Sequence, residues 1–346
     1  MLRLSVLDQA PVSAGSSGAQ ALAHSVDLAQ LADSLGYYRY WVAEHHGTPA
    51  LACAAPEALI GPIAAVTQRI RIGSGGVMLP HYAPLKVAEI FSMFAGLFPG
   101  RIDLGLGRAP GTDQATSFAL QRDRRQPAQD DFTQQLAELL AYLYDKIPAG
   151  HLFARLAALP GLPERPEPWL LGSSPQSGIW AAELGLPYMF ADFISPTGAA
   201  IAQRYRQDFV ASDMLAAPRL AVAASVICAD TDEEADRLAA SGRMLLTLLR
   251  QGTLVPVPSI ETAQRFFAEQ GMPPNGLIRA RRAITGAPAT VRAGIAALAA
   301  EYGAEEVMIV TITFDHAARR RSYELIAGAF GLPAEAPSDN LPLTSQ

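Results

Sequence analysis

Short runs of aliphatic and β-branched residues alternate with helical patterns along most of the chain. Residues 2–8 (Leu-Arg-Leu-Ser-Val-Leu-Asp) alternate loosely, which predicts a strand. Apolar residues then recur at spacings of three and four from Leu22 to Leu35, which predicts a helix ending at Gly36. Further strands are predicted at 38–43, 70–79, 102–107, 169–172, 188–193, 220–229 and 307–313. Further helices are predicted at 56–67, 84–98, 132–143, 176–184, 197–211, 232–249 and 317–330.

This order gives eight strand-then-helix units, the number that a (β/α)8 TIM barrel requires. A barrel needs about 250 residues, and this 346-residue chain carries its surplus at 108–130, 145–168 and 250–285. No linker rich in Pro and Ser divides the chain. We therefore expect a single α/β barrel domain with insertions over 1–332 and a C-terminal tail at 333–346. An open doubly wound sheet has the same alternation and is the alternative fold.

Composition narrows the class of protein. Half of the residues are hydrophobic and 17% are charged, which excludes a disordered chain and suits a parallel sheet covered by helices. The net charge of −6 argues against a nucleic-acid partner, which would require a basic face. Two cysteines form no disulfide framework, and neither a signal peptide nor an apolar run of 18 residues is present. We expect a cytoplasmic protein with no membrane association.

Two histidines end the second predicted strand, at the rim where barrels carry their function. Adjacent residues at a strand end point to opposite sides, so His45 and His46 are poorly placed to chelate one ion, and no metal site is predicted. One histidine can face the barrel mouth and serve in chemistry. The alternative is a pair of polar residues that cap a strand.

The third strand carries glycines at positions 73, 75 and 76. Glycine weakens a strand, so these positions indicate a plain bulge, a kink or the close approach of a flat ligand. Arg108 follows the fourth strand and suits a phosphate or a carboxylate, with a surface ion pair as the alternative.

Serines at 173, 174 and 177 flank the start of the helix after the fifth strand. Free N–H groups and hydroxyls at such a position form an anion site, and simple N-capping by Ser174 is the alternative. Arg108 and these serines lie on consecutive strand ends, so together they can hold one phosphate.

Four longer stretches resemble the bacterial luciferase-like flavin oxidoreductases, and among them the MsnO8-type subgroup without luminescence. These stretches are Tyr40–His46, Gly73–Pro80, Gly100–Asp113 and Asp315–Leu325. The resemblance covers residues 2 to about 330 and is most specific at 40–47 and 100–113. It implies a (β/α)8 barrel, usually dimeric, that binds reduced FMN, or in some branches coenzyme F420, at the barrel mouth. Most members insert one oxygen atom of O2 into an organic substrate through a flavin C4a-hydroperoxide.

The resemblance also implies roles for single residues. His45 holds the place of the catalytic histidine, and a histidine that titrates near neutrality suits proton transfer. Arg108 holds the place of the arginine that binds the flavin phosphate, and Ser174 and Ser177 hold those of its hydroxyl ligands. Ser173 replaces a family carboxylate beside them.

The Gly75–Gly76 bond matches a cis peptide behind the flavin ring of luciferase relatives. Both glycines are therefore expected to border the cofactor, and a side chain added at Gly75 is expected to project toward the ring.

The partners follow from the same resemblance. No segment of the sequence is typical of a nicotinamide site, so we expect a separate NAD(P)H:flavin reductase to deliver FMNH2. The predicted helices at 56–67 and 84–98 are rich in apolar residues and are expected to form a homodimer contact. Three functions stay open: a two-component FMNH2-dependent monooxygenase acting on a small organic substrate, an F420-dependent hydride-transfer enzyme, and a flavin-binding protein without catalysis. Retention of His45 favours an enzyme.

Overall fold

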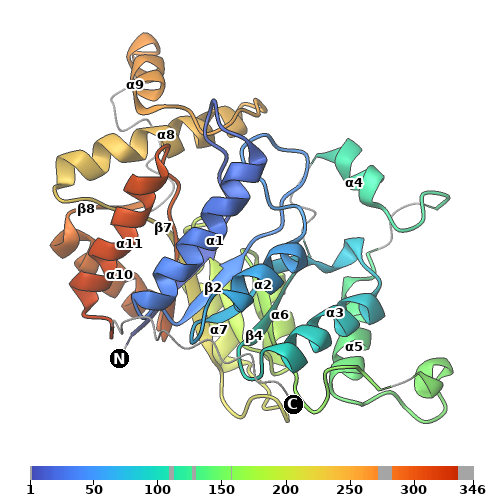
Figure 1. Ribbon diagram of the computed structural model, residues 1–346. Coiled ribbons are helices and arrows are strands. Elements are labelled where there is room, and N and C mark those ends of the chain that lie inside the picture. Colours follow the sequence, from blue (N-terminus) through green and yellow to red (C-terminus); the bar gives the residue numbers. More distant parts are fainter. Residues whose placement is uncertain (1, 109–112, 127–129, 157, 272–282, 334–346) are drawn as a thin grey trace.

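Eight parallel strands close into a barrel in the computed structural model, which describes residues 2–108, 113–126, 130–156, 158–271 and 283–333 (Figure 1). The barrel strands are β1 (Arg3–Asp8), β2 (Arg39–Val42), β3 (Arg71–Met78), β4 (Ile102–Gly107), β5 (Glu167–Gly172), β6 (Tyr188–Ala191), β7 (Leu220–Cys228) and β9 (Glu306–Val310). They pair in that order, and β9 closes the ring by pairing with β1. The fold is thus the predicted (β/α)8 barrel, and the open doubly wound sheet is wrong.

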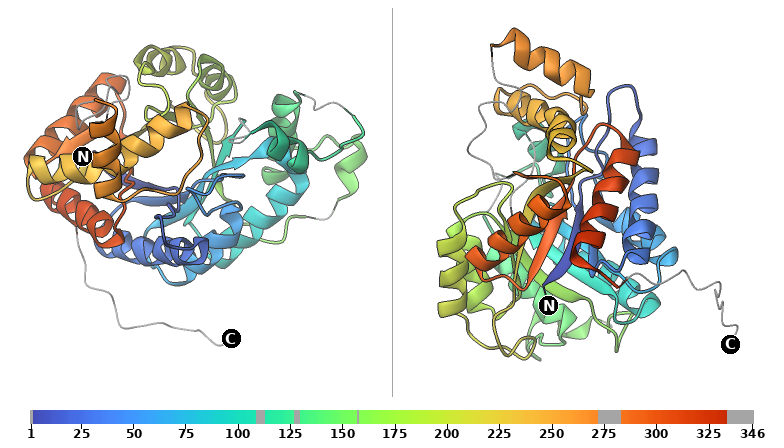
Figure 2. Two further views of the ribbon diagram at one scale, coloured as in Figure 1. Left: turned by 90° about the horizontal axis from the view of Figure 1, so that it is seen from above. Right: turned by 90° about the vertical axis from the view of Figure 1, so that its left-hand side faces the viewer.

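Helices surround the barrel on its outer side, as the view from above shows (Figure 2). They are α1 (Gly18–Ser34), α2 (Pro56–Ala65), α3 (Pro84–Leu97), α5 (Phe132–Leu143), α6 (Pro175–Glu183), α7 (Ala199–Gln207), α8 (Asp232–Arg250), α10 (Pro288–Tyr302) and α11 (His316–Phe330). Two shorter helices, α4 (Gln114–Leu120) and α9 (Ile260–Glu269), lie in segments predicted to be insertions. Figure 1 shows α8 and α9 beyond the carboxyl ends of the strands, where they cover part of the rim.

A ninth strand lies outside the barrel. The strand β8 (Ala283–Gly286) pairs with the carboxyl half of β7, after the residues of β7 that pair with β6. The sequence predicted an insertion over 250–285, and the structure shows that its end extends the sheet. The following helix, α10, was not predicted.

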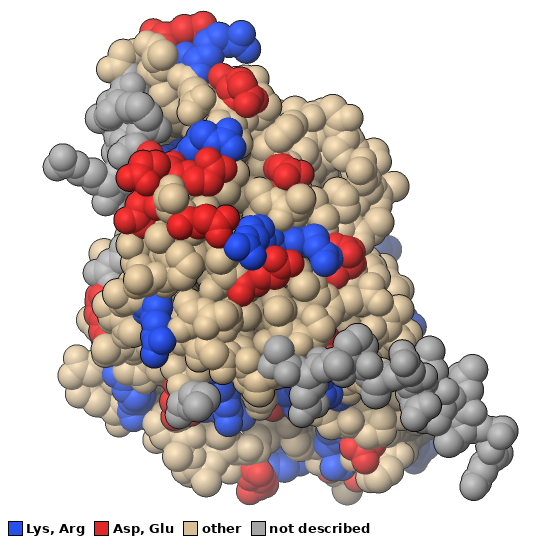
Figure 3. All heavy atoms as spheres, turned by 60° about the vertical axis from the view of Figure 1, so that its left-hand side comes forward, with Lys and Arg blue, Asp and Glu red and all other residues tan. Residues whose placement is uncertain are grey.

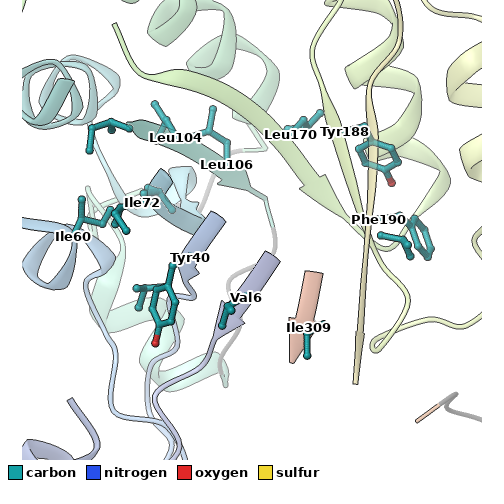
Figure 4. Close-up of a cluster of buried hydrophobic side chains, with 14 of the residues drawn as sticks. Val6, Tyr40, Ile60, Ile72, Leu104, Leu106, Leu170, Tyr188, Phe190 and Ile309 are labelled. Carbon is teal, nitrogen blue, oxygen red and sulfur yellow. The ribbon is translucent and has the colours of Figure 1, made fainter. Parts of the chain in front are cut away.

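Side chains along each strand alternate between two apolar layers, one outside the barrel against the helices and one inside it. Val6 and Tyr40 face outward toward the helices, where Ile60 of α2 packs near them (Figure 4). Their neighbours Leu7 and Trp41 face inward and belong to a second cluster inside the barrel. This alternation is the period of two that a strand imposes.

A buried charge cluster fills the amino end of the barrel. Nη1 of Arg39 lies 2.7 Å from Asp103, and its Nε lies 3.2 Å from Glu306. Glu167 lies 3.7 Å from the same guanidinium. Burial alone would raise the pKa of Asp103, but Arg39 and Arg71 hold that pKa below its usual range. Each of these buried charges therefore has an opposite charge beside it, as burial requires.

The outer surface mixes charges of both signs. On the side that carries α8, α10 and α11, acidic and basic side chains are interspersed among uncharged ones (Figure 3). Within the ranges given above, none of the helices combines the length and apolarity needed to cross a bilayer.

Candidate functional site

All seven site residues predicted from the sequence line one cavity at the carboxyl ends of β2 to β5. The cavity has a volume of about 430 Å³. The seven residues are His45, Gly75, Gly76, Arg108, Ser173, Ser174 and Ser177. Their convergence follows from the topology, because the carboxyl ends of neighbouring parallel strands meet at one rim.

The glycine bulge forms the inner wall of this cavity. The Gly75–Gly76 peptide bond is cis, as predicted, and the register between β3 and β4 shifts from Ser74 to Val77. A Cβ on Gly75 would overlap Cδ1 of Leu7 and lie 3.0 Å from Cβ of Trp41. The prediction that a side chain here would project toward a flavin ring is therefore wrong. It would point into the barrel interior, where there is no room for it.

The amino terminus of α6 forms the second wall. Ser174 occupies the N-cap position, yet its side chain makes no capping hydrogen bond, so the simple capping role is not what the structure shows. Ser177 is buried, and its hydroxyl donates to the carbonyl of Ser174 at 2.7 Å and contacts the Tyr188 hydroxyl at 2.9 Å. Ser173 is half-buried beside them. The exposed hydroxyl of Ser174 and the first-turn N–H groups are thus the groups most available to an anion.

Arg108 lies at the open side of the cavity, with its side chain 48% exposed. Its Nη2 donates to Asp130 at 2.7 Å, so the surface ion pair considered from the sequence is present. Its guanidinium also lies 5.5 Å from the ring centroid of Trp180 on α6. This contact holds the positive charge next to the helix terminus that carries Ser174. The carboxylate of Asp130 occupies a position that an anionic ligand would compete for.

His45 lies between the β2 strand end and the cavity. Its backbone N–H donates to the carbonyl of Cys53 at 2.9 Å. The ring atom Nδ1 is buried and has no hydrogen-bond partner among the described residues. Burial, and to a smaller degree the neighbouring His46, lowers the pKa of His45 to about 4. The expectation of a pKa near neutrality is therefore wrong, and the ring is uncharged at pH 7.

Glu44 is a site residue that the sequence reasoning missed. Its carboxylate is fully buried and accepts hydrogen bonds from Nε2 of His46 at 2.7 Å and from the backbone N–H of Met78 at 2.9 Å. Burial and the nearby carboxylate of Glu44 raise the pKa of Tyr82. Burial raises the pKa of Glu44, while His46 and Met78 oppose that rise. Glu44 therefore ties the histidine loop to the strand that carries the glycine bulge. A clue was present in the sequence, because Glu44 immediately precedes the histidine pair.

A second cavity, of about 650 Å³, adjoins the first. The two share four lining residues: Gln9, His45, Phe193 and Ile194. Aliphatic side chains of α8, the following loop and the ends of β7 and β9 form most of its wall. His45 thus borders a cavity that carries the glycine bulge, Arg108 and the serines on one side, and the larger apolar cavity on the other. Over the described ranges, no cluster of three His, Cys, Asp or Glu side chains is arranged to hold a metal ion.

These features define a (β/α)8-barrel protein with two adjoining cavities at the carboxyl ends of its strands, the position where such barrels carry their ligand sites. The chain belongs to the luciferase-like monooxygenase family, whose model matches residues 2–306.

Similar proteins span the whole fold. The chain is 46% identical to the protein YwcH of Bacillus subtilis (strain 168) over 332 residues, which is 95% of this chain and 99% of YwcH. It is 40% identical to a luciferase-like monooxygenase of Escherichia coli (strain K12), with 94% and 96% of the two chains covered. It is 36% identical to an N-acetyl-S-alkylcysteine monooxygenase of B. subtilis, with 95% and 98% covered.

Solved structures agree with the barrel assignment. Apo-MsnO8 superposes with a TM-score of 0.88 at 40% identity and covers 97% of this chain and 100% of its own. The oxygenating constituent of 3,6-diketocamphane monooxygenase from Pseudomonas putida, solved with FMN, superposes at 0.70 with 21% identity, covering 97% and 100%. An F420-dependent secondary alcohol dehydrogenase superposes at 0.66 with 14% identity, covering 95% and 98%. The last two show a shared fold.

Proposed function

We propose that this chain is the oxygenase component of a two-component monooxygenase, which uses reduced FMN and O2 to oxygenate a small organic substrate. The observation that carries the proposal is the pairing of the two cavities across His45. One is lined by the Gly75–Gly76 backbone, Arg108 and the serines at the start of α6, and the other mostly by aliphatic side chains. A separate NAD(P)H:flavin reductase supplies FMNH2 in this proposal.

The residues of the first cavity fit a flavin mononucleotide. The phosphate carries negative charge, and Arg108, Ser174 and the N–H groups of α6 offer the positive end that it needs. Gly75 and Gly76 present backbone to the cavity, because a Cβ on either would point toward the barrel interior or the backbone of β4, and a planar ring can lie against this backbone. The partnerless Nδ1 of His45 is one more polar atom that a ligand can satisfy.

The chain contributes binding, orientation and exclusion of water. When bound and reduced, the flavin supplies the electrons and the activation of O2. His45, uncharged at neutral pH, accepts or relays a proton at Nδ1, the atom that faces no protein partner. The aliphatic wall of the second cavity keeps water from the reacting groups. Glu44 also lines the first cavity, and its hydrogen bonds to His46 and Met78 position the histidine loop.

Relatives support this choice over its alternatives. A relative at 36% identity is an N-acetyl-S-alkylcysteine monooxygenase, and a structure of the same fold binds FMN. An F420-dependent dehydrogenase also shares the fold, so hydride transfer from F420 is the second candidate. A flavin-binding protein without catalysis is the third.

One titration separates the three. The apoprotein is titrated with FMN, FMNH2 and F420, and then supplied with O2, a flavin reductase, NADH and a panel of thioethers and ketones. We expect FMNH2 to bind tightest and a substrate to gain one oxygen atom by mass spectrometry with 18O2. Preferred binding of F420 would refute the FMN assignment. Tight flavin binding with no oxygen transfer to any compound in the panel would favour the non-catalytic role.

A further inference from the structure

The apolar cavity has one Lys or Arg side chain among its described lining residues, Arg243 of α8. The neighbouring wall residues on the same helix are Leu245, Leu246 and Leu249. A guanidinium in an aliphatic wall is costly to desolvate unless an anion lies beside it. Such a group is therefore the feature of this cavity that can discriminate between charged and neutral ligands.

The protein provides hydrogen-bond acceptors for only some of the N–H donors of the Arg243 guanidinium. Its side chain is 17% exposed, and Nη2 donates to Oδ1 of Asp236 at 2.6 Å. Nη1 reaches the backbone carbonyl of Asp236 at 3.3 Å. These contacts use two of the five N–H donors of a guanidinium. A ligand carboxylate can therefore bind to Arg243 either beside Asp236 or in its place.

The remaining charges favour a ligand with one negative charge. Asp113 also lines the cavity, and Asp236 stands next to Arg243. The carboxylate of Asp236 beside the guanidinium, and that of Asp113 elsewhere in the cavity wall, repel a dianion such as a phosphate monoester more strongly than a ligand with one carboxylate. The aliphatic wall in turn favours an apolar chain, since burying apolar surface contributes about 25 cal/mol per Å².

We propose that the apolar cavity binds an amphipathic monocarboxylate, with its carboxylate on Arg243 and its apolar part extending toward His45. The proposal rests on the proposed function only in calling this ligand the substrate. Arg243 is then a specificity-determining residue, because a carboxylate binds it in a planar, paired fashion that a neutral group cannot reproduce.

Binding to the apoprotein tests the proposal without any flavin chemistry. Decanoate and its neutral counterpart decanol are titrated by calorimetry against the native chain and four variants. Arg243→Met should weaken the binding of decanoate by about 10–100-fold, the loss expected for a charge-assisted hydrogen bond. The affinity for decanol should change by less than about 3-fold. Arg243→Lys should retain an intermediate affinity for decanoate. Asp236→Asn should strengthen decanoate several-fold, because it removes the competing carboxylate.

A matched control lies on the same helix. Arg237 is 45% exposed, pairs with Glu234 and is absent from the cavity lining, so Arg237→Met should leave both affinities unchanged. An equal loss of decanoate and decanol in Arg243→Met, or unchanged decanoate binding, would overturn the proposal. Circular dichroism is used to confirm that each variant is folded. The Asp236→Asn variant provides a second test, because weaker binding of decanoate to this variant would also contradict the proposal. Decanoate binding without FMN binding would refute the proposed function alone, and FMN binding without decanoate binding would refute this inference alone.

Discussion

Replacement of Glu44 tests whether one buried carboxylate holds the site together. Glu44→Ala removes the acceptor for two donors, the ring of His46 and the N–H of Met78. A buried donor left without a partner costs about 1–3 kcal/mol, and such costs are not additive. We therefore expect the free energy of unfolding to fall by about 2–4 kcal/mol, near the upper end for single substitutions.

The assay is urea unfolding followed by circular dichroism, with FMN affinity measured on the folded variant. Glu44→Gln keeps one acceptor oxygen and the same shape, so it should lose about half as much stability as Glu44→Ala. FMN binding should weaken in both, because Met78 lies two residues beyond the Gly75–Gly76 bulge. Glu89→Gln is the control, since Glu89 is 44% exposed and its nearest cation is 3.9 Å away. A loss below about 0.5 kcal/mol in Glu44→Ala, equal to that of the control, would refute the reasoning.

Three further predictions concern the cofactor, the proton and the assembly. Arg108→Ala should weaken reduced FMN by about 10–100-fold in a fluorescence titration, and unchanged affinity would remove Arg108 from the phosphate site. His45→Ala should keep FMNH2 affinity within a few-fold and lower turnover by about 10²-fold, whereas equal turnover would exclude a proton-transfer role. Light scattering should give about twice the chain mass of 36.7 kDa, through a contact that includes the exposed Met93 and Leu97 of α3, and a monomer at micromolar concentration would contradict it.

The barrel was predictable because its strands are buried on both faces and its helices carry one apolar stripe. All eight barrel strands fall within a few residues of their predicted positions. The strand β8 escaped prediction, since four residues are too short for a periodicity to stand out. The helix α10 did offer a signal, because its buried Val291, Ile295 and Leu298 recur at spacings of four and three. That signal lies after a segment interpreted as an insertion, and it was overlooked.

The site was predictable as far as it depends on strand ends. His45, the glycine bulge, Arg108 and the serines could be placed on one rim because parallel strands finish together. Side-chain directions and long-range partners were not predictable in this way. The inward direction of a Cβ on Gly75 depends on Leu7 and Trp41, and the pKa of His45 depends on how deeply its ring is buried. The apolar cavity depends on α8, which lies about 200 residues beyond His45 in the chain.

Both ends of the barrel contain buried polar side chains, but the partners of these side chains differ between the two ends. At the amino end, Arg39 lies within 4 Å of carboxylates from β4, β5 and β9, so its charge is balanced inside the protein. At the carboxyl end, burial keeps His45 uncharged, and its Nδ1 has no hydrogen-bond partner among the described residues. Buried polar groups normally have hydrogen-bond partners, because a buried donor or acceptor without one costs about 1–3 kcal/mol. At the amino end, the neighbouring carboxylates thus offset the cost of burying the charge of Arg39, although its Nη2 has no hydrogen-bond partner among the described residues. In the function proposed above, the bound ligand supplies the partner that Nδ1 of His45 lacks.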